Sequence, residues 1–457
     1  MPDPIPDAEQ LTVRFAQQLD ELASDPLPAS VQRAAERSLL NVLGTAIGAA
    51  RHEGVDILVA TAREVGGAPT HSAPGRREQV DALWACTITG FAAHVDDFDD
   101  THLDTVIHPG AAVLGPALTA AAERRSSGAE ALRAVAVGIE AQLRVGQAMS
   151  PWHYDDGWHI TGTCGVIGAA VTAGLLLELS ADQMANALGT AASQTLGQRE
   201  AFGTMIKGFH PGKASANGLL AARLAAEGFT GPTDVFEDPR GYFRALSPGG
   251  VAIERMLDGL GERWELMANT FKPYPCGIVS HPAIDAGIEL STEVPRAQDV
   301  ARIDARVHPL VLDLAGNRHP EDGLAARFST PHGIVVGLLD GHVDLDSYTD
   351  ARAVDTTVRE LRERVRLIPD EDAGRDETVV TITLGDGREV SSHITHAQGS
   401  LARPLTDEEL QDKVRSLIEP VLPGNTSAVI DAVGSLVEAP SIAALLSAIT
   451  TTSETGR

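Results

Sequence analysis

The densest cluster of residues that could carry chemistry is the segment 94–102, His-Val-Asp-Asp-Phe-Asp-Asp-Thr-His, which Asp104 and His108 follow closely. Four aspartates within five residues repel one another unless cations, hydrogen-bond donors or solvent offset their charge. The segment is therefore either a solvated acidic loop or part of a site that supplies positive partners. A metal site is a weaker interpretation, because His94, His102 and His108 lack the spacing that places ligands on one face of a helix.

Three of these aspartates also match a known metal motif. Asp96, Asp97 and Asp100 fit the DDxxD pattern that holds magnesium diphosphate in helical terpene synthases. Such a site needs aromatic walls around a carbocation, whereas this chain has only 10 Phe, 4 Tyr and 4 Trp and shows no second metal motif downstream. We therefore expect neither terpene chemistry nor a bound metal.

A second cluster is the segment 157–165, Gly-Trp-His-Ile-Thr-Gly-Thr-Cys-Gly, which stands directly before an apolar stretch of small residues. If Thr161 or Thr163 caps the helix that follows, the first N–H groups of that helix form an anion site beside His159. A carboxylate would bind well there. The alternative is that His159 is a structural histidine with satisfied hydrogen bonds beside a tryptophan.

Two further segments place a lysine among glycines and prolines. Lys207 lies in 203–213, whose spacing excludes a phosphate-binding P-loop because Lys213 is followed by alanine. Lys272 directly precedes a proline and is biased to an extended conformation. Lys207 is either an ammonium group held near tight backbone or a surface lysine in a turn. Lys272 lies where the sequence pattern changes, so it can point into a cleft between domains.

The elements that must position these residues are helical in the first half of the chain. From about residue 9 to 260, helical stretches alternate with short Gly/Pro breaks, as in 31–50 and 128–146, and we predict an all-α region. The most apolar stretch, 164–179, is shorter than the roughly 20 residues of a membrane span. Its small residues predict a buried core helix that packs closely against its neighbours.

The pattern changes after Asn269, where prolines become frequent. The period-2 alternation of 300–312 predicts a strand, and 378–394 with a turn at 385–387 predicts a β-hairpin. From Thr406 onward helical spacing returns. We therefore predict one helical domain formed by residues 1–269 and 406–457, and an α+β lid domain formed by residues 270–405.

Composition limits the partners and the compartment. The chain has 457 residues and a formal net charge of −27, which disfavours nucleic acid and anionic membranes as partners. The three cysteines, Cys86, Cys164 and Cys276, are too few for a disulfide framework, and the N-terminus lacks the pattern of a signal peptide. We expect a cytoplasmic protein that binds an anionic ligand through a local cluster of basic residues.

Together these segments resemble the MmgE/PrpD family over nearly the whole chain. The resemblance is carried by 94–123 (HVDDFDDTHLDTVIHPGAAVLGPALTAAAE), 157–170 (GWHITGTCGVIGAA), 187–232 (ALGTAASQTLGQREAFGTMIKGFHPGKASANGLLAARLAAEGFTGP), 271–285 (FKPYPCGIVSHPAID), 323–329 (GLAARFS) and 397–410 (AQGSLARPLTDEEL). It implies a mainly α fold with a smaller α+β domain. A large all-helical domain would be built from both chain ends, with an inserted α+β lid, and the protein would be a homodimer.

The resemblance also implies the residues of the site, without a cofactor or a metal. Carried over position by position, the catalytic residues are His108, His159, Lys207 and Lys272, and the substrate-binding residues include Asp97 and Thr101. To these we add Thr161 of the second cluster and His281 as expected substrate-binding residues. These residues must converge between body and lid into one positive cavity.

The implied activity is that of a cofactor-independent lyase that moves a proton next to a carboxylate of a small di- or tricarboxylate. In a 2-methylcitrate dehydratase-like hydro-lyase, His159 or Lys272 would take the α-proton, His108 would protonate the departing hydroxyl, and fixed cations would stabilise the enediolate. The alternatives are a cis-aconitate decarboxylase-like carboxy-lyase, an epimerase or isomerase, and a non-catalytic binding protein.

Two departures bear on this choice. Gly277 stands where decarboxylase-like relatives carry a histidine, and His281 lies four residues further on. The segment around Lys272 also differs from that of the epimerase branch.

Overall fold

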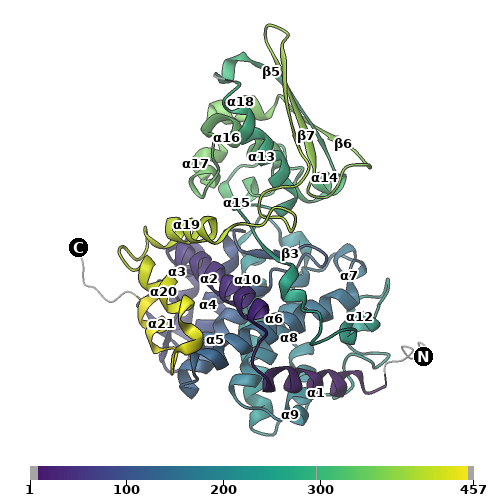
Figure 1. Ribbon diagram of the computed structural model, residues 1–457, viewed down its shortest axis with the longest axis vertical. Coiled ribbons are helices and arrows are strands. Elements are labelled where there is room, and N and C mark those ends of the chain that lie inside the picture. The colour runs from purple at the N-terminus through teal and green to yellow at the C-terminus, as the bar shows by residue number, and fades with distance from the viewer. Residues whose placement is uncertain (1–8, 295, 451–457) are drawn as a thin grey trace.

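Helices make up most of the computed structural model, which describes residues 9–294 and 296–450. Figure 1 shows a large helical body below a smaller lobe of helices and one sheet. The predicted fold class, mainly α with a smaller α+β part, is confirmed. Residues 1–8, which contain most of the segment on which the expectation of no signal peptide rests, lie outside the described residues.

The body comprises helices from both ends of the chain. Those that precede residue 260 are α1 (Leu11–Ser24), α2 (Ala29–Gly48), α3 (Glu53–Val65), α4 (Ala82–Val95), α5 (Pro109–Arg124), α6 (Gly128–Met149), α7 (Trp152–Asp155), α8 (Ile160–Leu176), α9 (Ala181–Ala192), α10 (Met205–Ala226), α11 (Tyr242–Leu246) and α12 (Glu254–Leu257). Those that follow residue 406 are α19 (Asp407–Ile418), α20 (Thr426–Gly434) and α21 (Ala443–Ala448).

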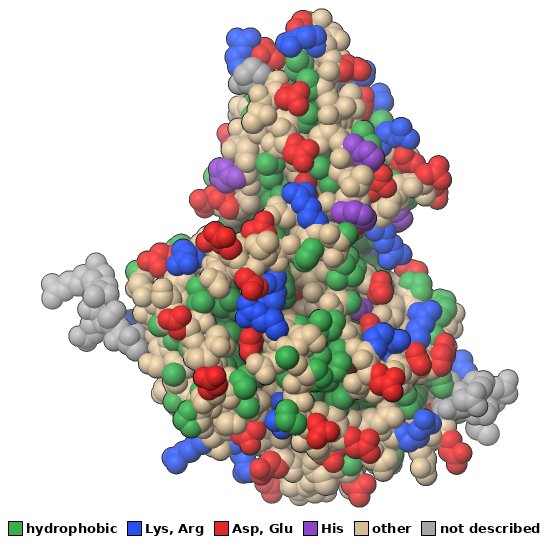
Figure 2. Space-filling model, viewed as in Figure 1, with side chains coloured by type: hydrophobic (Ala, Val, Ile, Leu, Met, Phe, Trp, Pro, Cys, Tyr) green, Lys and Arg blue, Asp and Glu red, His purple; other side chains and the backbone are tan. Residues whose placement is uncertain are grey.

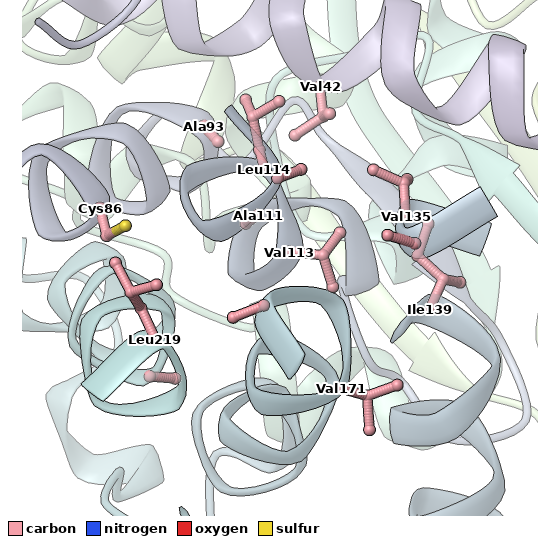
Figure 3. Close-up of a cluster of buried hydrophobic side chains, with 14 of the residues drawn as sticks. Val42, Cys86, Ala93, Ala111, Val113, Leu114, Val135, Ile139, Val171 and Leu219 are labelled. Atoms are coloured by element: carbon pink, nitrogen blue, oxygen red, sulfur yellow. The ribbon is translucent and has the colours of Figure 1, made fainter. Parts of the chain in front are cut away.

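Helix α8 forms the centre of the body, as the apolar stretch 164–179 predicts. Its residues are buried nearly throughout, and it packs against α5, α6, α9 and α10. Figure 3 shows apolar side chains of α2, α4, α5, α6, α8 and α10 meeting in this core. The small residues allow the close packing that we expected, because a Cβ at Gly168 would lie 2.7 Å from the Gly138 carbonyl oxygen on α6.

The C-terminal helices rejoin the body beside α2 (Figure 1). The side chains of Val414 and Leu417 of α19 pack against Gly44 and Gly48 of α2, where α2 has no side chains of its own. A capping box between Thr406 and the third residue of the helix starts α19 just where helical spacing returns in the sequence.

The smaller lobe is built around a four-stranded sheet. Its strands are β5 (Val300–Val307), β6 (Val365–Pro369), β7 (Thr378–Leu384) and β8 (Glu389–Ile394), and its helices are α13 (His281–Leu290), α14 (Leu310–Ala315), α15 (Gly323–Ala326), α16 (Thr330–Asp340), α17 (Asp350–Ala353) and α18 (Thr356–Arg362). The strand order is β6-β5-β7-β8, with β5 parallel to β6 and antiparallel to β7. The predicted hairpin is confirmed as β7–β8, and the strand predicted for 300–312 ends at Val307 because the chain turns into α14 after Pro309.

Two separate hydrophobic cores underlie the two lobes. One draws its buried residues from Leu11 to Phe271 and from Leu405 to Ile449, and the other from Tyr274 to Ile394. These cores support a division into domains near residues 270 and 405, which stays a prediction.

The expectation of a purely helical first half is wrong in one respect. It contains three short strands, β1 (His71–Ser72), β2 (Gln79–Val80) and β3 (Asp100–His102). Strand β3 pairs antiparallel with β4 (Asn269–Phe271), which brings the acidic segment beside the lysine segment. Period-2 patterns need more than two or three residues to show in a sequence, so such strands escape detection.

The surface carries the negative charge without concentrating it. On the face seen in Figure 2, acidic side chains are spread over both lobes and interspersed with basic ones. Within the described residues, no helix has the length and apolar character that a membrane span requires.

Candidate active site

A cavity of about 60 Å³ lies where the two lobes meet. The body contributes Asp97, Thr101, Val106, His108, Tyr154, His159, Phe202, Lys207 and Lys272, and the smaller lobe contributes Gly277, Ile278, Val279, Leu314 and Phe328. Six of the eight predicted site residues therefore converge on one cavity.

Asp97 holds both lysines of the cavity. Its Oδ1 atom lies 2.6 Å from Lys207 Nζ and 2.8 Å from Lys272 Nζ, and all three side chains are at least nine-tenths buried. Asp97 has a left-handed backbone conformation (φ 52°), which aspartate tolerates better than most residues. Burial alone would raise the pKa of Asp97, but the two ammonium groups hold it well below its usual value.

The two lysines differ in how many of their hydrogens are committed. Lys272 Nζ also donates to the backbone oxygen of Asp97 at 3.1 Å and lies 3.6 Å from Asp99 Oδ1. Lys207 Nζ donates to Asp97 and contacts His94 Nε2 at 3.1 Å. An ammonium group has three donors, so Lys207 keeps one hydrogen for the cavity, where its Nζ lies 5.6 Å from the Phe202 ring centre.

Asp99 orients two histidines. Its Oδ2 atom accepts from His94 Nδ1 at 2.6 Å, and its Oδ1 atom lies 3.3 Å from His108 Nδ1. His94 thus carries its hydrogen on Nδ1 and offers Nε2 to Lys207. Burial, and next to it the charge of Lys207, lowers the pKa of His94 to about 3, so this ring is neutral at physiological pH.

The proton position on His108 follows from its contacts. His108 Nδ1 lies 2.7 Å from the backbone oxygen of Asp100, which can only accept, so the hydrogen is on Nδ1. The other ring nitrogen, Nε2, then carries a lone pair. Burial, followed by the charge of Lys272, lowers the pKa of His108, which keeps the ring neutral and its Nε2 lone pair free.

His159 contacts a histidine that the sequence did not single out. His159 Nδ1 lies 3.0 Å from His210 Nδ1, so one of the two rings donates to the other. Among the described residues His159 Nε2 is buried and has no hydrogen-bond partner. Burial, reinforced by His94 and Lys207, lowers the pKa of His159 well below its usual value.

Three helices begin at this cavity. His108 is the N-cap residue of α5, His159 is the N-cap residue of α8, and Lys207 lies in the first turn of α10. Each N-terminus carries a partial positive charge, which favours an anion in front of it. We predicted a threonine cap for α8, but its N-cap residue is His159 and makes no side-chain cap hydrogen bond.

The charge of the cavity corrects one expectation. The ammonium groups of Lys207 and Lys272 are balanced by the carboxylates of Asp97 and Asp99, and burial keeps the histidines neutral. The predicted excess of positive charge is absent from these side chains. Attraction for an anion comes instead from the three helix ends and from the free hydrogen on Lys207.

Two predicted residues lie outside the cavity lining. Thr161 accepts from the backbone N–H of His108 at 3.2 Å and so supports the site from behind. His281 is buried, and its Nε2 atom lies 3.3 Å from the Cys276 oxygen. Burial lowers the pKa of His281 to about 3, as for a structural histidine.

The acidic segment is neither a solvated loop nor a single metal-binding face. Asp97, Asp99 and Asp100 are buried, and Asp96 pairs with Arg327 of the smaller lobe at 2.9 Å. The carboxylate of Asp100 accepts from the Gly110 N–H in the first turn of α5. The aspartates of the DDxxD match therefore contact three different partners.

One group of side chains still has the composition of a metal site. Ligand-type atoms of His94, Asp97, Asp99 and His108 lie within 4.8 Å of one another. However, the Asp97 oxygen in this group already contacts two ammonium groups, and a cation beside them would meet strong repulsion. These donors fit lysine better than a metal ion.

Comparisons with known proteins identify the family of the chain. Residues 13–253 match the MmgE/PrpD N-terminal domain, and residues 274–438 match the MmgE/PrpD C-terminal domain. The chain is 26% identical over 437 residues to the cis-aconitate decarboxylase of Aspergillus terreus, a match that covers 89% of each chain. It is 26% identical to the mouse (Mus musculus) cis-aconitate decarboxylase over 428 residues, covering 89% of this chain and 86% of that protein. It is 28% identical to the human (Homo sapiens) protein of the same name over 362 residues, covering 75% and 74%.

Proposed function

Because this chain is a lyase that belongs to the MmgE/PrpD family, we propose that it acts on a small di- or tricarboxylate, without a cofactor, by moving a proton next to a carboxylate. The observation that carries the proposal is the convergence of Lys207, Lys272, His108 and His159 on one buried cavity. Fixed donors in such a water-poor cavity stabilise the negative charge of an enediolate.

The hydrogen-bond pattern supports specific roles. His108 is the general base, since its Nε2 lone pair is free while Nδ1 is fixed by the Asp100 oxygen. In the tautomer in which His210 donates to Nδ1, His159 carries its hydrogen on Nε2 and donates a hydrogen bond to the departing hydroxyl. Lys207 binds a substrate carboxylate with its remaining hydrogen. Lys272, whose donors face Asp97 and Asp99, contributes charge and holds the site together.

The first candidate reaction is dehydration. His108 removes the proton on the carbon next to a carboxylate, and an enediolate forms. The bond from the neighbouring carbon to its hydroxyl then breaks, and the proton that His108 has taken up completes the departing water. A cavity lined by Gly277 rather than a histidine supports this candidate over decarboxylation.

Decarboxylation of a cis-aconitate-type substrate is the second candidate, and the named relatives favour it. In this reaction one carboxylate leaves as carbon dioxide and an acid protonates the carbanion. Substitution of Gly277 can distinguish the two candidates. Its backbone conformation (φ −55°) is open to any residue, and a Cβ there would meet only the Arg327 oxygen, at 3.7 Å. We expect Gly277→His to fold normally and to raise the ratio of carbon dioxide release to water loss.

The test is turnover in heavy water. The enzyme is incubated with citrate, methylcitrate, cis-aconitate and related acids, and NMR follows water loss, carbon dioxide release and deuterium uptake. We expect water loss. His108→Ala should lower kcat by roughly 10²–10⁴-fold, as expected for loss of a general base, whereas the exposed control His342→Asn should match the wild type. Deuterium uptake without either loss would indicate an isomerase, and binding without any exchange would indicate a non-catalytic protein.

We also propose that the protein is a cytoplasmic homodimer, as the family resemblance implies. Light scattering should then give about twice the chain mass of 48.0 kDa. A mass that stays at one chain across the working concentration range would exclude the dimer.

A further inference from the structure

The side chain of Lys413 reaches the active site from the C-terminal helix α19. Lys413 is buried, and its Nζ atom donates to the backbone oxygen of Phe98 at 2.6 Å, to Asn41 Oδ1 at 2.7 Å and to the backbone oxygen of Lys272 at 2.8 Å. The same atom lies 4.3 Å from the centre of the Phe98 ring. Lys413 forms no ion pair within 4 Å among the described residues.

Two of these three acceptors belong to the candidate site. Phe98 lies between Asp97 and Asp99, and Lys272 is the residue whose ammonium group contacts Asp97. The same two segments are joined a second time, because the Lys272 N–H donates to the Asp99 oxygen at 3.2 Å beside the β3–β4 pair. Lys413 therefore fastens the lysine segment to the aspartate segment from outside the cavity lining.

Packing alone does not account for a lysine at this position. A buried ammonium group is costly to desolvate, and an apolar side chain of similar size would fill the same space. What an apolar residue lacks is three donors directed at three oxygens. The chain has only four lysines among its 36 basic residues, and three of them, Lys207, Lys272 and Lys413, are buried in this region.

We propose that Lys413 is a positioning residue of the active site: its ammonium group fixes the Phe98 and Lys272 carbonyls relative to each other and thereby holds the Lys272 ammonium group against Asp97. The effect on turnover rests on the proposed function, whereas the effect on Lys272 does not.

Protonation controls this arrangement. Burial lowers the pKa of Lys413 to about 7; the charged groups that face it are Asp99 and Asp100, which oppose the change, and Lys272, which adds to it. A neutral amine has two hydrogens for three oxygens, so one hydrogen bond is lost and a lone pair faces an oxygen. The hold of Lys413 on the Phe98 and Lys272 carbonyls is then weakened, and kcat should fall as the pH rises through about 7.

The experiment uses the full chain with ¹³Cε-labelled lysine, which gives four signals, one for each lysine. Variants are Lys413→Met, which keeps the length of the side chain, and Lys413→Arg, which keeps the charge. The control is Arg415→Met, because Arg415 lies on the same helix with a half-exposed side chain. Lys213, on the outer part of α10, is the internal reference signal.

We expect Lys413→Met to shift the Lys272 signal and leave Lys213 unchanged. It should lower kcat by about tenfold to a hundredfold with a smaller change in KM, as for a misplaced site. Lys413→Arg should recover part of kcat and lose the decline above pH 7, because guanidinium stays charged. Arg415→Met should behave as the wild type.

The proposal is overturned if folded Lys413→Met keeps the wild-type Lys272 signal. If that variant does not fold, a pH titration of the labelled wild-type protein tests the proposal instead. The Lys272 signal must move over the pH range in which the Lys413 signal titrates. A Lys272 signal that stays unchanged over that range overturns the proposal. Absence of turnover on every acid would contradict the proposed function while leaving the lysine signals to decide the role of Lys413.

Discussion

At the scale of single residues, Asp97 is the centre of the site. One carboxylate oxygen accepts from two ammonium groups, and the residue achieves this with a left-handed backbone that directs its side chain between them. Lys207 and Lys272 would otherwise repel each other in a water-poor cavity. The rest of the site depends on this pairing, because it decides which lysine keeps a hydrogen for a ligand.

Asp97→Asn tests this pairing with little change of shape, since asparagine also tolerates the left-handed region. The substitution leaves two buried ammonium groups without their main counter-charge, and we expect the free energy of unfolding to drop by about 3–5 kcal/mol. Urea unfolding measures the loss. Asp96→Asn is the comparison, because Asp96 pairs with Arg327 outside the cavity lining. Equal stability of Asp97→Asn and the wild type would contradict the role of Asp97 as a counter-ion.

At the scale of elements, the crossing of α4 and α10 sets the distance between two site residues. His94 lies in the last turn of α4, and Lys207 lies in the first turn of α10. The two helices touch backbone to backbone, because a Cβ at Gly212 would lie 2.3 Å from the Thr87 oxygen and 2.9 Å from the Phe91 nitrogen. The 3.1 Å contact between His94 and Lys207 therefore depends on Gly212, which lies about one and a half turns beyond Lys207 on α10.

Gly212→Ala should force the two helices apart. We expect a loss of about 1–3 kcal/mol in stability, as for an overpacked core, together with a reduced kcat because Lys207 moves from His94. Gly434→Ala on α20 is the matched control, since a Cβ there would meet nothing within 4 Å. Chemical denaturation and initial rates measure both variants. A Gly212→Ala protein with wild-type stability would show that the helices can separate without cost.

At the scale of the whole molecule, the site belongs to neither lobe alone. Nine of its lining residues come from the body and five from the smaller lobe. A cavity of about 60 Å³ is well below the roughly 300–1,000 Å³ of most small-molecule pockets. We therefore expect the walls to move apart to admit a substrate; the ion pair of Asp96 with Arg327 is one contact between the lobes.

The buried histidines make the whole fold sensitive to acid. Burial, the largest cause in each case, lowers the pKa of five histidines to about 3 or 4: His94, His153, His210, His281 and His332. Between these values and about 6.5 the unfolded chain binds more protons than the folded one, so stability falls as the pH falls. Each group contributes about 1.4 kcal/mol per pH unit in that range.

Melting temperatures should therefore decline from pH 6.5 towards pH 4 in scans of the wild-type protein. Asp100, Glu140 and Asp285 act in the opposite direction, because burial raises the pKa of each carboxyl group, that of Asp100 to about 7, but they are fewer than the histidines. His332→Gln removes one of the five histidines and should reduce the slope of melting temperature against pH. His332 is chosen because it lies in the smaller lobe, away from the cavity lining. A melting temperature that stays constant over this range would mean that the histidines are accessible to protons in the folded state.

The sequence alone determined the helical body, the α+β insertion, the hairpin and the central helix, because periodicity and turn residues are local properties of a chain. It also determined which residue types are available, and six of the eight predicted site residues line one cavity. The tertiary structure decided the rest. His94, Asp99 and His210 gained roles through partners that no spacing reveals, and the scarcity of lysine was the signal that could have indicated Lys413.

The physical reason lies in sequence separation and burial. The three oxygens around Lys413 come from residues 41, 98 and 272, so they meet only after distant segments of the chain have packed together. Likewise, the residue types along the chain predicted a positive cavity. In the structure, burial keeps the histidines neutral, and the carboxylates of Asp97 and Asp99 balance the charge of the two lysines. Thr161 and His281 match the same motifs as the lining residues, but the packing of α8 and α13 directs them elsewhere.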